Sequence, residues 1–269
     1  MISQRHATKN ESDEPSMRLA VLIDADNAQA AVIEGLMAEI ARFGEATVKR
    51  IYGDFTSPNS ASWKRVLQKF AIKPVQQFAY TTGKNATDST LIIDAMDLLY
   101  TRKFDGFCLV TSDSDFTGLA MRIREEGFTV FGFGEQKTPE AFKNACHKFI
   151  FTEVLRPVTR KEPIRTAARA RIASAGAPVP MQAAAERNQI EFPTKFVLDA
   201  LEQSSDESGW ANLGTFGSYL TKIQPDFDSR IYGFKRLSDL VRARTDLFMT
   251  EERVQSGGNR KVLYLHARQ

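Results

Sequence analysis

The sequence predicts an α/β domain with a mostly parallel sheet and helices on both faces, followed by a smaller α+β domain. Two observations support this prediction. Short apolar runs alternate with helical patterns from residue 18 to about residue 151, which is typical of parallel strands joined by crossover helices. In the C-terminal third, helical patterns come first and strand patterns last. The 269 residues allow one or two domains and at least one full hydrophobic core.

The first domain is predicted to begin with a buried strand at 19–23, a continuous apolar run. Further strands are predicted at 46–52, 72–79, 107–111, 129–133 and 149–151. Helices are predicted at 28–43, 60–70, 87–100 and 116–126. A fifth helix is expected to start at Thr138 and Pro139, with the threonine as cap and the proline in the first turn. The 87–100 helix is apolar almost all round, so we expect it to be well buried.

The second domain has three helical patterns and a β-hairpin signal. The helices are predicted at 196–203, 212–223 and 233–243, and the strands at 248–254 and 261–266. A Gly-Gly-Asn turn at 257–259 separates the two strands. Three helices followed by a hairpin is the pattern of a winged helix-turn-helix.

Composition places the domain boundaries. We predict a disordered tail at 1–16, the first domain at 17–155, a basic linker rich in Ala, Pro and Arg at 156–189, and the second domain at 190–269. The chain carries a net charge of +3, but residues 156–195 alone carry an excess of five positive charges. That excess indicates either a contact with a polyanion or a solvated linker.

Several function classes are excluded. The two cysteines, Cys108 and Cys146, lie far apart and only three histidines occur, so a disulfide scaffold and a Cys/His metal module are excluded. No apolar run is long enough for a membrane span, and the polar N-terminus has no signal-peptide pattern. We therefore expect a cytoplasmic protein without membrane contact.

Acidic residues follow two of the predicted buried strands. Asp24 ends the first strand, and Asp113 and Asp115 follow the fourth, while Asp88 begins the apolar helix. Sites in open α/β sheets lie at the carboxyl ends of strands, so these carboxylates should converge. Converging carboxylates repel one another unless a cation lies between them, and oxygen ligands alone favour Mg²⁺ or Mn²⁺. Such an ion polarises a phosphoryl group and activates water.

Several of these acids also have a structural interpretation, whereas Asp24 and Asp113 are harder to explain in that way because they follow buried strands. Asp26, Asp88 and Asp115 have sequence positions suited to helix N-caps. Asp94 points about 120° away from Asp88 on the same helix, at 100° per residue, so it is either an outer-shell group or the partner of a buried Lys or Arg. Lys84 is either a phosphate contact or a solvated lysine.

The residues in the first domain resemble the successive motifs of the NYN domain, a branch of the PIN-like metal-dependent ribonucleases, over about residues 18–153. The resemblance implies a Rossmann-like parallel sheet and a Mg²⁺ or Mn²⁺ site. It implies metal ligation and catalysis by Asp24, Asp88, Asp113 and Asp115, and it matches Asn27 and Ser112 to family positions beside these acids. Together with Asp26, Lys84 and Asp94, these two are predicted to be substrate-binding or outer-shell groups. The family often has glycine after the lysine of the second motif, where this chain has Asn85. The matching motifs are 23–27 (IDADN), 84–88 (KNATD), 93–97 (IDAMD) and 111–116 (TSDSDF).

The second domain is similar to the OST-HTH/LOTUS domain, a winged helix associated with RNA. The matching residues are 213–220, 227–228 and 232–240. The resemblance implies RNA binding, and we expect Lys235, Arg236 and Arg242 to contribute to it. A solvated helix face is the alternative for these cations, and a protein is the alternative partner for the domain.

The sequence thus favours a metal-dependent endoribonuclease with a C-terminal RNA-binding module. One alternative is a non-catalytic RNA-binding or adaptor protein that uses the winged helix. Another is a haloacid-dehalogenase-type phosphatase, in which Asp24 is the nucleophile and Asp26 the general acid/base.

Overall fold

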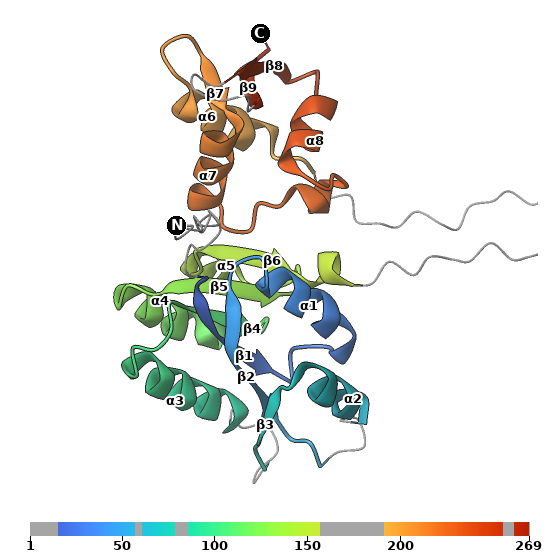
Figure 1. Ribbon diagram of the computed structural model, residues 1–269, viewed down its shortest axis with the longest axis vertical. Helices are drawn as coiled ribbons and strands as arrows, with labels where there is room; N and C mark the ends of the chain where they lie inside the picture. The colour runs from blue at the N-terminus through green and yellow to red at the C-terminus, as the bar shows by residue number, and fades with distance from the viewer. Residues whose placement is uncertain (1–15, 57–60, 79–85, 157–190, 255–260, 269) are drawn as a thin grey trace, which may run out of the picture.

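The computed structural model describes residues 16–56, 61–78, 86–156, 191–254 and 261–268 (Figure 1). The predicted tail and linker lie outside these ranges except for Ser16 and Arg156, and Lys84 lies outside them as well. Among the described residues, no helix combines the length and the hydrophobicity needed to traverse a bilayer.

The first domain is built on a six-stranded sheet in the order β3-β2-β1-β4-β5-β6. Every pair of neighbouring strands is parallel. This confirms the predicted α/β class, and the two strand series run outward from β1 and β4. The strands are β1 (Arg18–Asp24), β2 (Glu45–Gly53), β3 (Lys73–Gln76), β4 (Gly106–Val110), β5 (Thr129–Gly134) and β6 (Lys148–Phe151).

Helices cover both faces of the sheet, and each face has its own apolar core. One core contains residues of α3, α4 and α5, and the other contains residues of α1, α2 and η4. The central strands β1 and β4 are buried on both faces, because they contribute side chains to both cores. The helices are η1 (Ala30–Val32), α1 (Ile33–Ile40), α2 (Ala61–Phe70), α3 (Ala86–Tyr100), η3 (Ser114–Phe116), α4 (Thr117–Glu125), α5 (Glu140–Ala145) and η4 (Thr152–Leu155).

Two helix starts differ from the prediction. The helix predicted at 28–43 consists of η1 and α1, because Asp24 to Ala28 form a turn in which the Ala28 amide donates to the Asp24 carbonyl. Thr138 does not cap α5: its hydroxyl donates to the Glu135 carbonyl, and Pro139 is the N-cap residue.

The expectation that α3 is well buried was wrong for one face. Ile93 is 63% exposed and Tyr100 is 59% exposed, whereas Leu91 and Ala95 lie in the core. A helix packed against one face of a sheet leaves its outer face to solvent even where that face is apolar.

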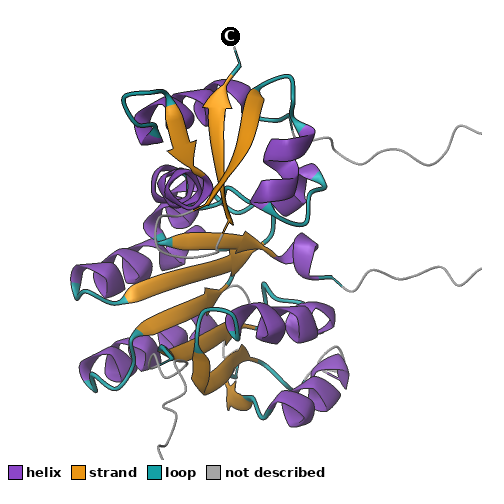
Figure 2. Ribbon diagram, turned by 45° about the horizontal axis from the view of Figure 1, so that its top comes forward, coloured by secondary structure: helices purple, strands orange, loops and turns teal. Residues whose placement is uncertain are grey.

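The second domain combines three α-helices with a three-stranded antiparallel sheet in the order β7-β9-β8 (Figure 2). The strand β7 was not predicted; it is three residues long and pairs with β9. The elements are α6 (Thr194–Ser204), β7 (Trp210–Asn212), α7 (Leu213–Ile223), η5 (Ser229–Tyr232), α8 (Leu237–Ala243), β8 (Phe248–Val254) and β9 (Lys261–Ala267).

The third predicted helix, 233–243, starts four residues late. Gly233 has a left-handed backbone with φ of 86° and ends η5, so α8 begins only at Leu237. Glycine adopts this conformation without the strain that a Cβ atom would cause.

The two domains are in contact along the free edge of β6 (Figure 1). The Phe149 amide donates to the Pro225 carbonyl at 2.9 Å, and Lys143 forms an ion pair with Asp226 at 2.7 Å. Arg230 forms two hydrogen bonds to the Glu39 carboxylate, at 2.9 and 3.1 Å. The segment 225–231 therefore covers an edge strand that would otherwise present unpaired backbone groups.

Candidate metal centre

The predicted acids lie where the strand order reverses. Asp24 is the last residue of β1, and Asp113 follows the neighbouring strand β4. Because β1 and β4 begin the two strand series, their carboxyl ends form the crevice in which open α/β sheets bind ligands. The sequence order of the motifs thus places them at one edge of the sheet.

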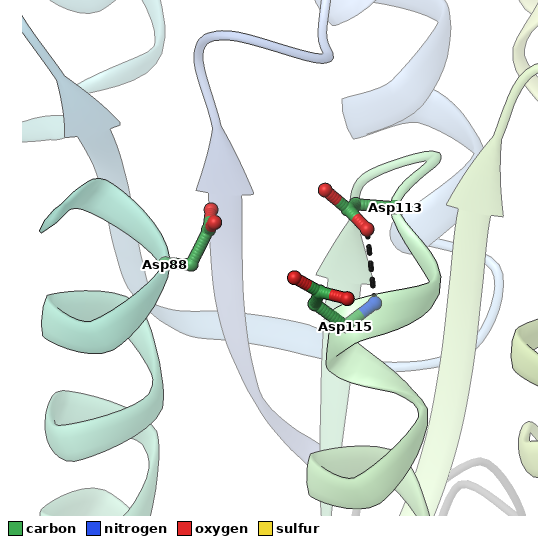
Figure 3. Close-up of side chains that lie close together, drawn as sticks. All are labelled: Asp88, Asp113 and Asp115. Carbon is green, nitrogen blue, oxygen red and sulfur yellow. Dashed lines mark hydrogen bonds between the residues drawn. The ribbon is translucent and has the colours of Figure 1, made fainter. Parts of the chain in front are cut away.

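Three of the four acids come together as one group (Figure 3). Asp88 lies in the first turn of α3, while Asp113 and Asp115 lie at the start of η3. One carboxylate oxygen from each lies within 4.8 Å of the others. Two oxygens bound to one Mg²⁺ at 2.0–2.1 Å are at most about 4.2 Å apart, so small side-chain rotations would let all three contact one ion.

Asp113 is linked directly to Asp115 within this group. Its side chain is the N-cap of η3 and accepts a hydrogen bond from the Asp115 amide at 2.9 Å. The capping role considered for Asp115 therefore belongs to Asp113. Asp26 is not a cap either, since Gln29 is the N-cap residue of η1.

Asp24 adjoins the group without being part of it. Its carboxylate is fully buried and accepts hydrogen bonds from the Asp26 amide at 3.0 Å, the Asn27 side chain at 2.7 Å and the Thr111 hydroxyl at 2.9 Å. Burial raises the pKa of Asp24, and the hydrogen bonds oppose that effect. A buried carboxylate engaged in this way is poorly placed to attack a substrate, which argues against the phosphatase alternative.

Thr111 is a functional candidate that the sequence reasoning missed. Its hydroxyl donates to Asp24 and accepts a hydrogen bond from the Asp113 amide at 3.1 Å, so it links the ends of β1 and β4. Ser112, which the motif suggested instead, accepts a hydrogen bond from the Glu135 amide and holds the loop after β5. The available signal was a hydroxyl residue directly after a buried strand.

The electrostatics of the group favour a bound cation. Burial, together with repulsion from Asp24, Asp113 and Asp115, raises the pKa of Asp88 to about 6. The ligand atoms are all carboxylate oxygens, which suit hard ions such as Mg²⁺ or Mn²⁺. The residues present therefore fit a divalent ion.

Asp94 lies outside this group and has cationic and phenolic partners. It forms an ion pair with Arg50 and accepts a hydrogen bond from the Tyr52 hydroxyl, both on β2. Of the two alternatives for Asp94, the structure supports the partner of a part-buried arginine. Burial and Asp94 together raise the pKa of Tyr52 far above its usual range.

The cations predicted to bind RNA are separated in the structure. Lys235 and Arg236 lie next to the first domain, where they line a hollow with Glu39 and Arg42. Arg242 instead pairs with Glu252 of β8 at 2.7 Å.

Comparison with known proteins gives two family matches. Residues 18–155 match the NYN domain, and residues 188–259 match the OST-HTH/LOTUS domain. None of the curated proteins matches the chain.

Solved structures give three further similarities. An uncharacterised protein of Nitrosomonas europaea is 60% identical, over 37% of this chain and 93% of its own, with a TM-score of 0.30. A fragment from Chromobacterium violaceum is 31% identical, over 30% of this chain and 84% of its own, with a TM-score of 0.25. A Vibrio parahaemolyticus protein of unknown function is 17% identical, over 51% of this chain and 94% of its own, with a TM-score of 0.44.

The family matches agree with the geometry in order and extent. The NYN match spans the six-stranded parallel sheet and every acid of the candidate site, and the OST-HTH/LOTUS match begins before α6 and covers most of the second domain. The chain belongs to the NYN domain family and carries an OST-HTH/LOTUS domain after its NYN domain.

Proposed function

We propose that this protein is a metal-dependent endoribonuclease that hydrolyses RNA phosphodiester bonds. NYN domains are generally RNase-like hydrolases, and OST-HTH/LOTUS domains point to RNA binding. The observation that carries the proposal is the convergence of Asp88, Asp113 and Asp115, from α3 and η3, at the crevice between β1 and β4. Mg²⁺ or Mn²⁺ is the proposed cofactor.

The proposed site divides the work between two sets of residues. Asp88, Asp113 and Asp115 would hold the ion. Asp24 and Thr111 keep the ends of β1 and β4 in register, because the carboxylate of one accepts from the hydroxyl of the other. When bound, a divalent ion neutralises charge on the phosphodiester and activates water for in-line attack on phosphorus.

The remaining predicted residues have supporting parts. Asn27 donates to Asp24 and so fixes the turn after β1. Asp26 is exposed in the same turn, two residues after Asp24. Contacts of Lys84 and Asp26 with substrate stay predictions.

The proposal is tested with purified protein and labelled single-stranded RNA in Mg²⁺, Mn²⁺ or EDTA. We expect cleavage with either ion and none in EDTA. Asp113→Asn should lower the cleavage rate at least about 100-fold, because it removes a carboxylate charge that would bind the ion. Asp97→Asn is the matched control, since Asp97 is an exposed acid on the same helix as Asp88.

Calorimetric titration of Mn²⁺ separates the alternatives. Wild-type affinity for Mn²⁺ in Asp113→Asn would place the ion elsewhere. Tight Mn²⁺ binding by wild-type protein without RNA cleavage would favour the non-catalytic RNA-binding alternative.

A further inference from the structure

The contact between the two domains leaves a groove with an excess of positive charge. It consists of two adjoining hollows, of about 690 and 300 Å³, that share Gly217, Thr221, Arg236 and Leu237. In Figure 1 the helix α7 lies above α5 and β6, and residues of α7 line both hollows. We call this feature the interdomain groove.

Cations from both domains line the interdomain groove. Six cationic side chains face two carboxylates, Glu39 and Asp228, among the described residues. The first domain contributes two of the cations and the second contributes four. They are Arg42, Lys148, Lys222, Arg230, Lys235 and Arg236.

The two carboxylates are already engaged by one of these cations. Arg230 forms hydrogen bonds with both Asp228 and Glu39, at distances between 2.6 and 3.1 Å. Arg42 also contacts Glu39, at 3.1 Å, so two arginines share that carboxylate. Lys222, Lys235 and Arg236 form no ion pair with any described carboxylate. The groove thus holds cations that the described part of the chain does not neutralise.

Lys148 is a cation of the groove whose charged form is destabilised by its surroundings. Burial lowers its pKa, while Asp228 and Glu39 counteract part of that effect. Its ammonium group lies 5.1 Å from the centroid of the Phe43 ring. A cation held in a part-buried position without a close carboxylate is suited to an anionic ligand that enters the groove.

We propose that the interdomain groove binds the phosphate backbone of RNA, so that the two domains grip the substrate together. This proposal deepens the proposed function, because it takes RNA as the substrate. An open groove lined with lysine and arginine suits an extended polyanion, which gains affinity from phosphate contacts without reading sequence. The winged helix alone supplies only one wall.

The groove and the acid cluster lie toward opposite ends of the strands. Arg42 follows the C-terminal end of α1, and Lys148 is the first residue of β6, whereas Asp113 and Asp115 follow the carboxyl end of β4. The five-residue strand β4 spans about 17 Å. RNA held in the groove must continue along the first domain to reach the acids, so longer RNAs should bind and be cut at lower concentrations than short ones.

The test measures binding of a fluorescently labelled single-stranded RNA to the full chain in EDTA, over a series of salt concentrations. Because EDTA prevents metal-dependent cleavage, the result does not depend on the proposed activity. Each lost phosphate contact should weaken binding about fivefold at 0.1 M salt and reduce the log–log salt slope by about 0.7. We expect losses of this size in Arg42→Gln, and a loss of about 25-fold with a slope change of about 1.4 in Lys235→Gln/Arg236→Gln.

Two matched controls remove a cation outside the groove. Lys64→Gln changes an exposed lysine of α2, at the end of the first domain remote from the winged helix (Figure 1). Lys261→Gln changes an exposed lysine of β9, in the second domain, whose ammonium group lies 3.6 Å from the Glu252 carboxylate. Equal losses in the controls and the groove variants would overturn the proposal in favour of diffuse attraction.

A further variant distinguishes RNA binding that needs both domains from attraction of RNA by positive charge alone. Glu39→Gln/Asp226→Asn removes two negative charges near the groove and breaks the two interdomain ion pairs found among the described residues. Attraction by charge alone predicts tighter RNA binding, whereas a grip that needs both walls predicts weaker binding. Thermal unfolding confirms that the variant is folded. Unchanged or tighter binding would assign RNA to one domain alone and overturn the proposal, even if the wild-type protein cleaves RNA.

Discussion

The molecule contains two clusters of carboxylates that differ in what surrounds them. At the end of the sheet, Asp88 lies among other acids, and burial and repulsion raise its pKa to about 6. At the domain interface, burial by itself would raise the pKa of Asp228, but hydrogen bonds and attraction from Arg230 bring it below its usual value. The same chemical group is thus destabilised as an anion in one place and stabilised in the other.

The two clusters differ in whether a side chain of the protein supplies a cation for the carboxylates. The interface carries its own cation, Arg230, so it can serve as a permanent contact between domains. The acid cluster gains stability from a cation supplied from outside, because converging carboxylates otherwise repel one another. Such a cluster is costly to the fold unless a ligand offsets the repulsion, which is typical of functional sites.

The largest expected effect comes from removing the cation of the interface. Arg230→Met leaves Glu39 and Asp228 part-buried without their main partner and should destabilise the protein by about 3 kcal/mol, since breaking a buried pair costs several kcal/mol. Thermal unfolding measures the change. Arg242→Met removes only an exposed pair with Glu252 and should cost less than about 1 kcal/mol. Equal losses in the two variants would remove the distinction between interface and surface.

A somewhat smaller effect is expected from adding the missing cation to the acid cluster. Mn²⁺ at 100 times its dissociation constant should stabilise the wild-type protein by about 2.7 kcal/mol. The gain should vanish in Asp113→Asn and persist in Arg230→Met, because only the former touches the proposed site. Scanning calorimetry with and without Mn²⁺ provides the measurement. A gain lost in Arg230→Met would instead couple the ion to the interface.

The smallest effect concerns pH in the absence of metal. The pKa of Asp88 is higher in the folded protein, at about 6, than its ordinary value of 3.8, so the folded state binds more protons and its stability falls as pH rises from about 4 to 6. Asp88→Asn should remove part of this fall, on the order of 1 kcal/mol once solvent screening is allowed for. Thermal unfolding in EDTA at a series of pH values is the test, and identical pH profiles for both proteins would contradict it.

The sequence by itself predicted the framework of the first domain. Continuous apolar runs identify the central strands, because strands buried on both faces have no polar alternation. The ends of these runs also identify the residues that follow each strand. That order was enough to predict that acids gather at one edge of the sheet, where Asp88, Asp113 and Asp115 lie together. Sequence patterns predicted helix boundaries less well where a backbone conformation decides them. Gly233 is an example, because its left-handed conformation delays the start of α8.

Only the tertiary structure decided which polar side chains meet across the fold. The partner of Asp94 is Arg50, 44 residues away, and the partner of Arg230 is Glu39, 191 residues away. Periodicity reports which face of an element is buried, but it does not report which residue of another element lies opposite. The role of Thr111 and the cations of the interdomain groove depend on such pairings. These pairings are set by strand order and by the packing of one domain against the edge strand of the other. At that edge, residues distant in sequence lie in the same part-buried, low-dielectric environment.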